Sequence, residues 1–174
     1  LFSSFGSGSI ATGRQQIDNY LFLLLSSKDN RLTLNELSEQ VYDSIPVVRK
    51  NLKVCEEWLA VFELRLNFRR NYGVFLTGSE ENIRLAIKHL VLNNGLYSID
   101  EAISFFARGL DLALLKKCIF TMKDKWDLKF AEESFHSLLI YATLAIVRGR
   151  FGLLNISEAD RDTIPRYEEY NWSK

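Results

Sequence analysis

The stretch "LTLNELSEQVYDSIPVVRKNLKVCEEWL", Leu32 to Leu59, contains two helical patterns separated by a short break. Thr33 followed by Glu36 has the spacing of a capping box, which predicts that the first helix begins at Thr33. "DS" at 43–44 ends that pattern, and Pro46 is typical of the first turn of a new helix, where its missing N–H costs no hydrogen bond. The second helix has a buried stripe at i, i+4, i+7 and i+11, formed by Val48, Leu52, Cys55 and Leu59. Together the two patterns predict a helix-turn-helix.

The second helix of a helix-turn-helix enters the major groove of DNA, and residues near its start meet the base edges. The start of this helix is poor in hydrogen-bond donors, because Pro46 has no N–H and Val47 offers only contact with a thymine methyl. Beyond it the outward face is first basic and then acidic at Glu57. The candidate DNA-binding residues of this helix are Ser44, Val47, Arg49, Lys50 and Lys53.

The flanking sequence predicts the rest of a winged helix. A helical pattern begins at Arg14 and precedes the helix-turn-helix. "ELRLNFRRNYGVFLTG" alternates apolar and polar residues around "RNYG", which indicates a two-stranded hairpin. Arg69 and Arg70, near the hairpin tip, are the remaining candidate DNA-binding residues. A further helix is expected after the hairpin, capped by Ser79.

"NNG" at 93–95 indicates a domain boundary, and the patterns beyond it are helical over roughly 99–107, 110–125 and 131–149. We therefore expect a mostly α chain with three parts. Residues 1–13, rich in Ser and Gly, are expected to be a flexible linker or an expression remnant. Residues 14–93 are expected to form the winged helix-turn-helix domain. Residues 94–174 are expected to form an all-α domain, and the aromatic-rich end suggests that this domain is incomplete.

Composition excludes several functions. The 22 basic and 22 acidic residues cancel, so any contact with an anionic partner must come from a local patch. The longest apolar run, "LLIYATLAIV", is about half of a membrane span, so no membrane partner is expected and the chain is expected to be cytoplasmic.

Cys55 and Cys118 both lie in apolar helical patterns and are expected to be buried, reduced thiols.

No catalytic site is expected, because the chain lacks a nucleophile motif, a phosphate-binding loop and a histidine paired with a nucleophile. The two histidines, His89 and His136, lack ligand neighbours at metal-binding spacing, so we expect no metal and no cofactor. The chain is therefore expected not to be an enzyme.

The run from "LTLNELSEQVYDS" to "NYGVFLTGSEENIR" resembles the second (Mga-like) helix-turn-helix unit of bacterial transcriptional regulators that contain PTS regulation domains, the activators of mannitol, mannose and lichenan operons. The family's pattern of an aromatic residue, glycines, a glutamate and an arginine is met by Tyr72, Gly73, Gly78, Glu80 and Arg84. "KWDLKFAEESFHSLLIYATLAIVRGR" is similar to the first PTS regulation domain and ends its apolar run with Arg148. The resemblance implies a regulator that binds double-stranded DNA, forms a homodimer through its helical domain, and responds to phosphotransferase-system proteins.

One position departs from that resemblance. The family's phosphorylated histidine stands in an "(I/L)HLA" setting, whereas the matching residue here is Tyr141. A phenol is a different phosphoryl acceptor from imidazole and has a much higher pKa, so the usual mechanism is not expected at Tyr141. His136 is a weak substitute, because five residues along a helix turn it onto another face. Any histidine that accepts a phosphoryl group is then expected outside this chain.

Two further interpretations stay open at this stage. One is that the helix-turn-helix is a degenerate module that does not bind DNA and acts as a spacer or dimerisation scaffold. The other is that the chain belongs to a virulence regulator built from the same modules. The basic residues of the second helix and the hairpin favour DNA contact, and the apolar start of that helix favours the spacer.

Overall fold

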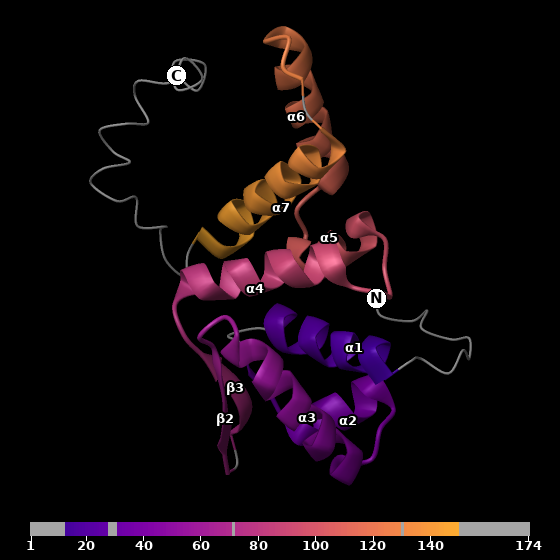
Figure 1. Cartoon of the computed structure of the whole chain (residues 1–174), viewed down its shortest axis with the longest axis vertical. Helices are drawn as coiled ribbons and strands as arrows, with labels where there is room; N and C mark the ends of the chain where they lie inside the picture. Colours follow the sequence, from indigo (N-terminus) through magenta and orange to yellow (C-terminus); the bar gives the residue numbers. More distant parts are fainter. Residues whose placement is uncertain (1–12, 28–30, 71, 130, 150–174) are drawn as a thin grey trace.

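The computed structural model describes residues 13–27, 31–70, 72–129 and 131–149 (Figure 1). These residues form seven helices and three strands. The predictions for the Ser- and Gly-rich start and for the aromatic-rich end concern residues 1–12 and 150–174, which lie outside the described ranges. One boundary was wrong, since Gly13, expected in the linker, is the first residue of a helix.

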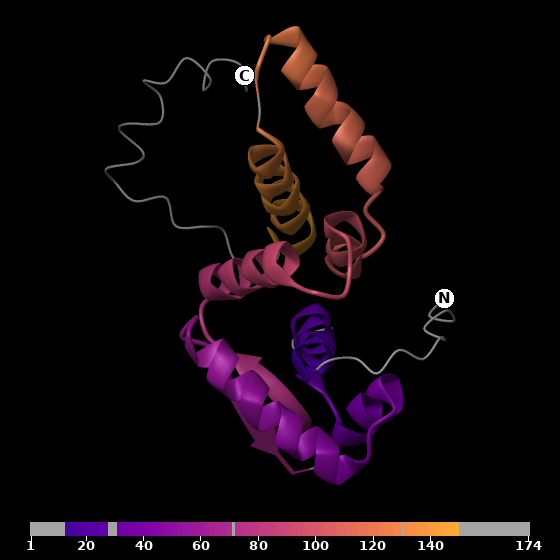
Figure 2. The ribbon, with the colours of Figure 1, turned by 45° about the vertical axis from the view of Figure 1, so that its right-hand side comes forward.

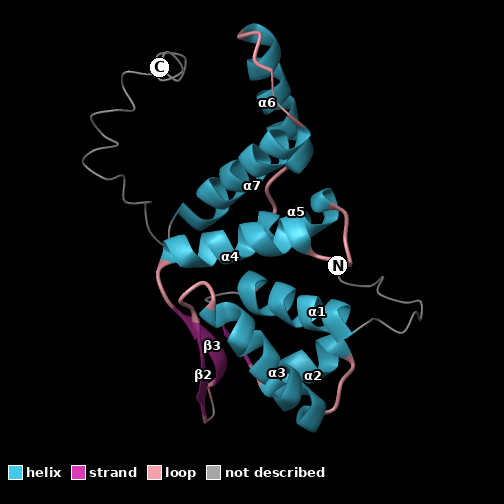
Figure 3. Cartoon of the chain, viewed as in Figure 1, coloured by secondary structure: helices cyan, strands magenta, loops and turns pink. Residues whose placement is uncertain are grey.

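The amino-terminal elements have the order of a winged helix-turn-helix, as expected. They are α1 (Gly13–Ser26), β1 (Arg31–Leu32), α2 (Leu34–Val41), α3 (Ile45–Ala60), β2 (Arg65–Arg69), β3 (Gly73–Thr77) and α4 (Glu80–Asn93). The hairpin of β2 and β3 lies at the edge of an otherwise helical molecule (Figure 3).

The sheet has one strand more than expected. β1 pairs antiparallel with β3, so the strand order is β1-β3-β2. β1 is two residues long, which is too short to show an alternating pattern. Its pairing places Arg31 beside the hairpin, a position that the sequence pattern did not predict.

α2 begins with the predicted capping box. Thr33 Oγ1 accepts from the Glu36 N–H at 3.1 Å, and the Thr33 N–H donates to Glu36 at 2.7 Å.

The turn between α2 and α3 is connected to α1 by a hydrogen bond. The carboxylate of Asp43, in this turn, accepts from the Tyr20 hydroxyl at 2.6 Å. Burial and this hydrogen bond raise the pKa of Tyr20 above its usual range. The angle between α2 and α3 is therefore supported from the core side.

The inner face of the sheet and the inward stripe of α3 share one core. Val48, Leu52, Cys55 and Leu59 are all 0–1% exposed, which confirms the predicted stripe. Leu66, Val74 and Leu76 on the strands, and much of α1, belong to the same cluster of buried residues. Because α3 and β2 pack against each other through these side chains, the outward face of α3 and the hairpin are held as one unit.

The second half of the described chain is helical. It contains α5 (Ile99–Ala107), α6 (Leu112–Lys125) and α7 (Glu132–Arg148). α4 lies between the winged helix and these helices and packs against α1, α5 and α7, while α6 and α7 extend away from the winged helix (Figure 2).

One prediction about this half was wrong. Cys118 is exposed, because α6 buries only Ile119 among its residues, whereas Cys55 is buried as expected. On α7 the apolar Leu138 and Ile146 do not face inward and are 40% and 58% exposed. α7 instead turns Leu139, Ile140, Thr143 and Leu144 inward.

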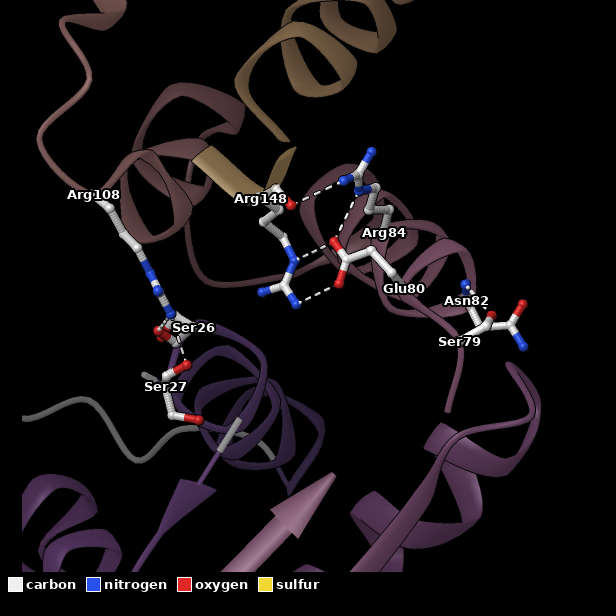
Figure 4. Close-up of polar contacts among 8 residues, drawn as sticks. All are labelled: Ser26, Ser27, Ser79, Glu80, Asn82, Arg84, Arg108 and Arg148. Atoms are coloured by element: carbon white, nitrogen blue, oxygen red, sulfur yellow. Dashed lines mark hydrogen bonds and ion pairs between the residues drawn. The ribbon is translucent and has the colours of Figure 1, made fainter. Parts of the chain in front are cut away.

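Charged residues join the two halves. Glu80, the first residue of α4, accepts hydrogen bonds from Arg84 at 2.9 Å and from two nitrogens of Arg148 at 2.8 and 2.9 Å. Arg84 also donates to the backbone carbonyl of Arg148 at 3.1 Å (Figure 4). Arg84 and Arg148 are 6% and 3% exposed. Residues quoted for the two separate halves of the resemblance thus meet in one buried cluster, which connects the end of α7 to the start of α4.

Arg108 makes a second connection of this kind. It follows α5 and donates to the carbonyl oxygens of Ser26 and Ser27 at 2.9 and 2.7 Å (Figure 4). These carbonyls lie at the carboxyl end of α1, where a cation complements the helix dipole. Arg108 and the cluster around Glu80 therefore both connect the winged helix to the helical half.

Candidate nucleic-acid interface

The outward face of α3 carries the predicted cations. Ser44, Arg49, Lys50 and Lys53 are exposed, and Val47 is 37% exposed. Ser44 is the N-cap of α3, and its side chain makes no capping hydrogen bond. These side chains are accessible to a partner because the opposite side of α3 supplies the core stripe.

The same face ends in carboxylates. Glu56 and Glu57 are exposed in the second half of α3, so its positive charge is confined to the first half. A phosphate backbone is attracted to the first half and repelled by the second. The first two turns of α3 are therefore the part suited to DNA.

The hairpin brings a second set of cations beside α3. Arg69 ends β2, and Arg70 follows it in the turn; both are exposed. Gly73 begins β3 with φ 103°, a conformation that L side chains rarely adopt. A Cβ atom there would also collide with the backbone of Leu32 and Thr33. This glycine permits β1 to approach the hairpin closely.

A groove of about 490 Å³ joins three of the predicted residues. Arg49 lines it from α3, and Arg69 and Arg70 line it from the hairpin. The wall from α2 is its first turn, from Thr33 to Asn35. Ser44, Val47, Lys50 and Lys53 are not in the lining and lie on α3 outside the groove.

The start of α2 lies at the groove and adds an electrostatic field that favours anions. The N–H groups of a first turn carry partial positive charge, and helix starts commonly bind phosphate. Glu36 stands in the same turn, but its carboxylate is used in the capping box. The hydrogen bond from the Thr33 N–H is the main cause that lowers the pKa of Glu36, and the nearby Arg31 contributes.

Two residues near the groove were missed by the sequence patterns. Phe68 is 51% exposed and lines the groove together with three arginines. The guanidinium carbon of Arg31 lies 4.3 Å from the centre of the Tyr72 ring. The alternation of β2 puts Phe68 on the same face as the buried Leu66 and so did not indicate its exposure. Arg31 reaches the hairpin only through the pairing of β1 with β3.

The predicted regulatory residues lie on α7, away from α3. Tyr141 is 45% exposed and accepts a hydrogen bond from Lys88 of α4 at 3.2 Å. The Lys88 ammonium also lies 4.5 Å from the centre of the Tyr141 ring. His136 is partly buried, with its ring centre 5.9 Å from that of Phe135. Tyr141 and His136 therefore have separate surroundings.

Two absences concern only the described ranges. There, no helix combines the length and hydropathy that crossing a bilayer requires. The described ranges also contain no group of three or more His, Cys, Asp or Glu side chains that could hold a metal ion.

The described elements thus form a three-stranded winged helix-turn-helix with a basic groove between α3 and the hairpin. Residues 14–90 match the Mga helix-turn-helix domain. The resemblance of the winged-helix part to an Mga-like helix-turn-helix unit, inferred from the sequence, is thereby confirmed.

Two curated relatives are regulators. Over 129 residues the chain is 27% identical to the transcriptional regulator ManR of Bacillus subtilis (strain 168), an alignment that covers 72% of this chain and 20% of that protein. Over 155 residues it is 23% identical to the probable licABCH operon regulator of the same organism, covering 87% of this chain and 24% of that protein. The chain thus spans about a fifth to a quarter of the length of these relatives. No solved structure matches it significantly.

Proposed function

We propose that this chain is the DNA-binding and regulatory part of a cytoplasmic transcriptional activator of a sugar operon. In this proposal the Mga domain contacts double-stranded DNA through the start of α3 and through the hairpin. The observation that carries it is the groove in which Arg49 lies together with Arg69 and Arg70 beside the first turn of α2. Contacts from these residues position a protein on the phosphate backbone and do not read the sequence.

The helical half is proposed to form the homodimer and to receive the regulatory signal. Exposed apolar side chains support a subunit contact there, since Leu138 and Ile146 on α7 and Leu114 on α6 are 40–58% exposed. A dimer would also set the spacing of two winged helices on DNA, because half-sites lie about one helical turn apart. Sedimentation velocity at rising protein concentration tests this part, and a monomer at every concentration would contradict it.

Control by the phosphotransferase system is the finer part of the proposal. It rests on the resemblance of "KWDLKFAEESFHSLLIYATLAIVRGR" to the first PTS regulation domain. Because Tyr141 replaces the family's histidine, the phosphoryl acceptor is proposed to lie in the longer protein, outside residues 1–174. Mass spectrometry of the longer protein after incubation with phosphotransferase components tests this, and the absence of any phosphohistidine would refute it.

Binding of the chain to a duplex of about 30 base pairs tests the DNA contact, measured by fluorescence anisotropy between about 50 and 200 mM salt. The variant Arg49→Ala/Lys50→Ala/Lys53→Ala is compared with wild type. We expect steep salt dependence for wild type and a slope reduced by about one for each lost phosphate contact. Lys117→Ala/Lys129→Ala, which removes two exposed cations of the helical half, is the control and should leave the slope unchanged.

The competing function is a spacer or dimerisation scaffold without DNA contact. The apolar start of α3 and the carboxylates of Glu56 and Glu57 favour it. If the wild-type chain shows no binding at the lowest salt concentration, the DNA proposal is abandoned in favour of the spacer.

A further inference from the structure

The sheet of the winged helix has an exposed side that the proposed interface does not use. In an antiparallel sheet, directly paired residues point to the same face and successive residues alternate. Phe75 pairs with Arg31 of β1 and with Asn67 of β2, so these three share one face. Val74 and Leu76 point to the other, buried face. We call the solvent side the outer sheet face; its members are Arg31, Arg65, Asn67, Arg69, Phe75 and Thr77.

This face carries three arginines, and the Glu36 carboxylate near Arg31 belongs to α2 and not to the face. Arg31, Arg65 and Arg69 are all exposed, and no carboxylate belongs to the face. Among the residues that the structure describes, no salt bridge engages any of the three arginines. The outward face of α3 differs, because its cations are followed by Glu56 and Glu57. The outer sheet face is thus complementary in charge to a polyanion.

One aromatic ring fixes two of these arginines. Tyr72 lies edge-on against Phe75, with ring centres 5.3 Å apart and an angle of 89°. The guanidinium carbons of Arg31 and Arg69 lie 4.3 and 5.9 Å from the centre of the Tyr72 ring. A guanidinium held against a ring by its face keeps its in-plane N–H donors for a second partner, and their fork geometry matches a phosphate.

We propose that the outer sheet face is a second contact surface for the backbone of double-stranded DNA, in which Tyr72 is the positioning residue for Arg31 and Arg69. The inference rests on the proposed function, because it requires that the Mga domain binds DNA. Arg69 belongs to the outer sheet face and also lines the groove. The proposed interface therefore extends from the groove, across the hairpin, to the side of the sheet opposite α3. The contacted groups are phosphates, so this surface adds affinity and orientation without reading bases.

The test uses the full chain, the duplex and the salt range described above. Arg31→Ala/Arg65→Ala should reduce the slope of log affinity against log salt by about 1.8, since each lost phosphate contact is worth about 0.9. The control Lys117→Ala/Lys129→Ala removes the same charge from the helical half and should not change the slope. These four residues are exposed, so both variants are expected to fold.

The role of Tyr72 is tested by two substitutions. Tyr72→Phe keeps the ring and should bind like wild type. Tyr72→Leu removes it and should weaken binding about two- to fivefold, the range of an exposed cation–π contact. If both variants fold and bind the duplex with equal affinity, the positioning role of Tyr72 is refuted.

The outcomes separate this inference from the proposed function. If wild type binds and the α3 variant weakens it, but Arg31→Ala/Arg65→Ala keeps the wild-type slope, the second surface is refuted and the proposed function stands. If wild type fails to bind the duplex at low salt, both are refuted. Tighter binding to a single-stranded oligonucleotide than to the duplex, dependent on Tyr72, would also overturn the inference, because the surface would then serve stacked bases.

Discussion

Cys55 shows how the core controls the chemistry of a single residue. It is 0% exposed on the inward stripe of α3, where the thiolate form would lose its hydration. Burial raises the pKa of this thiol to about 12, and the nearby carboxylate of Asp18 acts in the same direction. Cys55 is therefore held as a thiol and serves as a small apolar core residue.

The raised pKa of Cys55 makes stability depend on alkaline pH. The folded state keeps the proton while the unfolded state releases it near its ordinary pKa, so the stabilisation is complete below that value and is lost as pH rises toward the folded pKa. We expect the free energy of unfolding to fall between about pH 8 and about pH 10. Urea unfolding at both pH values measures this.

Cys55→Ala is the variant that isolates the effect. It should be less stable than wild type at the lower pH because of the small cavity, but it should lose less stability on going to the higher pH. An unchanged pH dependence in Cys55→Ala would show that Cys55 is not the group responsible. Tyr20 also has a raised pKa, so part of the loss near the upper pH limit is expected to remain.

At the scale of the element, the hairpin depends on one glycine. Gly73 joins the turn to β3 at φ 103°, and its missing Cβ leaves room for the backbone of β1. Without that approach β1 could not pair with β3, and Arg31 would be removed from the Tyr72 ring. The conformation of one residue therefore determines whether the outer sheet face forms.

Gly73→Ala should destabilise the chain more than a matched glycine replacement. Gly109 has φ 86°, but a Cβ there would meet no atom within 4 Å, so Gly109→Ala measures backbone strain alone. We expect Gly109→Ala to cost about 1–2 kcal/mol and Gly73→Ala at least about 1 kcal/mol more, because the second change adds a collision with backbone. Urea unfolding compares the two variants, and equal losses would show that β1 moves aside without cost.

At the scale of the whole molecule, Glu80 connects the two halves. Its carboxylate bonds with Arg84 of the same helix and with Arg148, the last residue of α7. Both arginines are nearly inaccessible to water, so neither can replace the carboxylate with solvent. α7 also carries Tyr141, which contacts Lys88 of α4. A movement of α7 would therefore act directly on α4, the last helix of the winged helix.

Glu80→Gln should be strongly destabilising. The amide preserves the shape but removes the negative charge that both buried guanidinium groups contact at this position, and removal of one partner from a buried ion pair costs about 3–5 kcal/mol. Glu81→Gln is the control, since Glu81 is exposed in the same turn and its loss should cost less than about 1 kcal/mol. Urea unfolding measures both. Similar losses for the two variants would show that solvent or another group replaces the carboxylate of Glu80.

Much of the local structure followed from the sequence. The capping box at Thr33, the stripe of α3, the hairpin and the three carboxyl-terminal helices were all predicted and are present. Each depends on residues a few positions apart, because capping and helical or strand periodicity are interactions within one element. The exposed cations of α3 followed for the same reason.

Other features depended on the tertiary structure. The pairing of β1 with β3, the grouping of Arg49 with Arg69 and Arg70, and the stacking of Arg31 on Tyr72 join residues from separate elements. Glu80 and Arg148 are 68 positions apart, and no local pattern indicates that they meet. The exposure of Cys118 and Ile146 likewise depended on which sides of α6 and α7 pack against other helices.

The sequence alone determined the elements and their charges, because those arise from neighbouring residues. Packing decided which charges meet in a site, because contacts between distant segments exist only once the chain is folded.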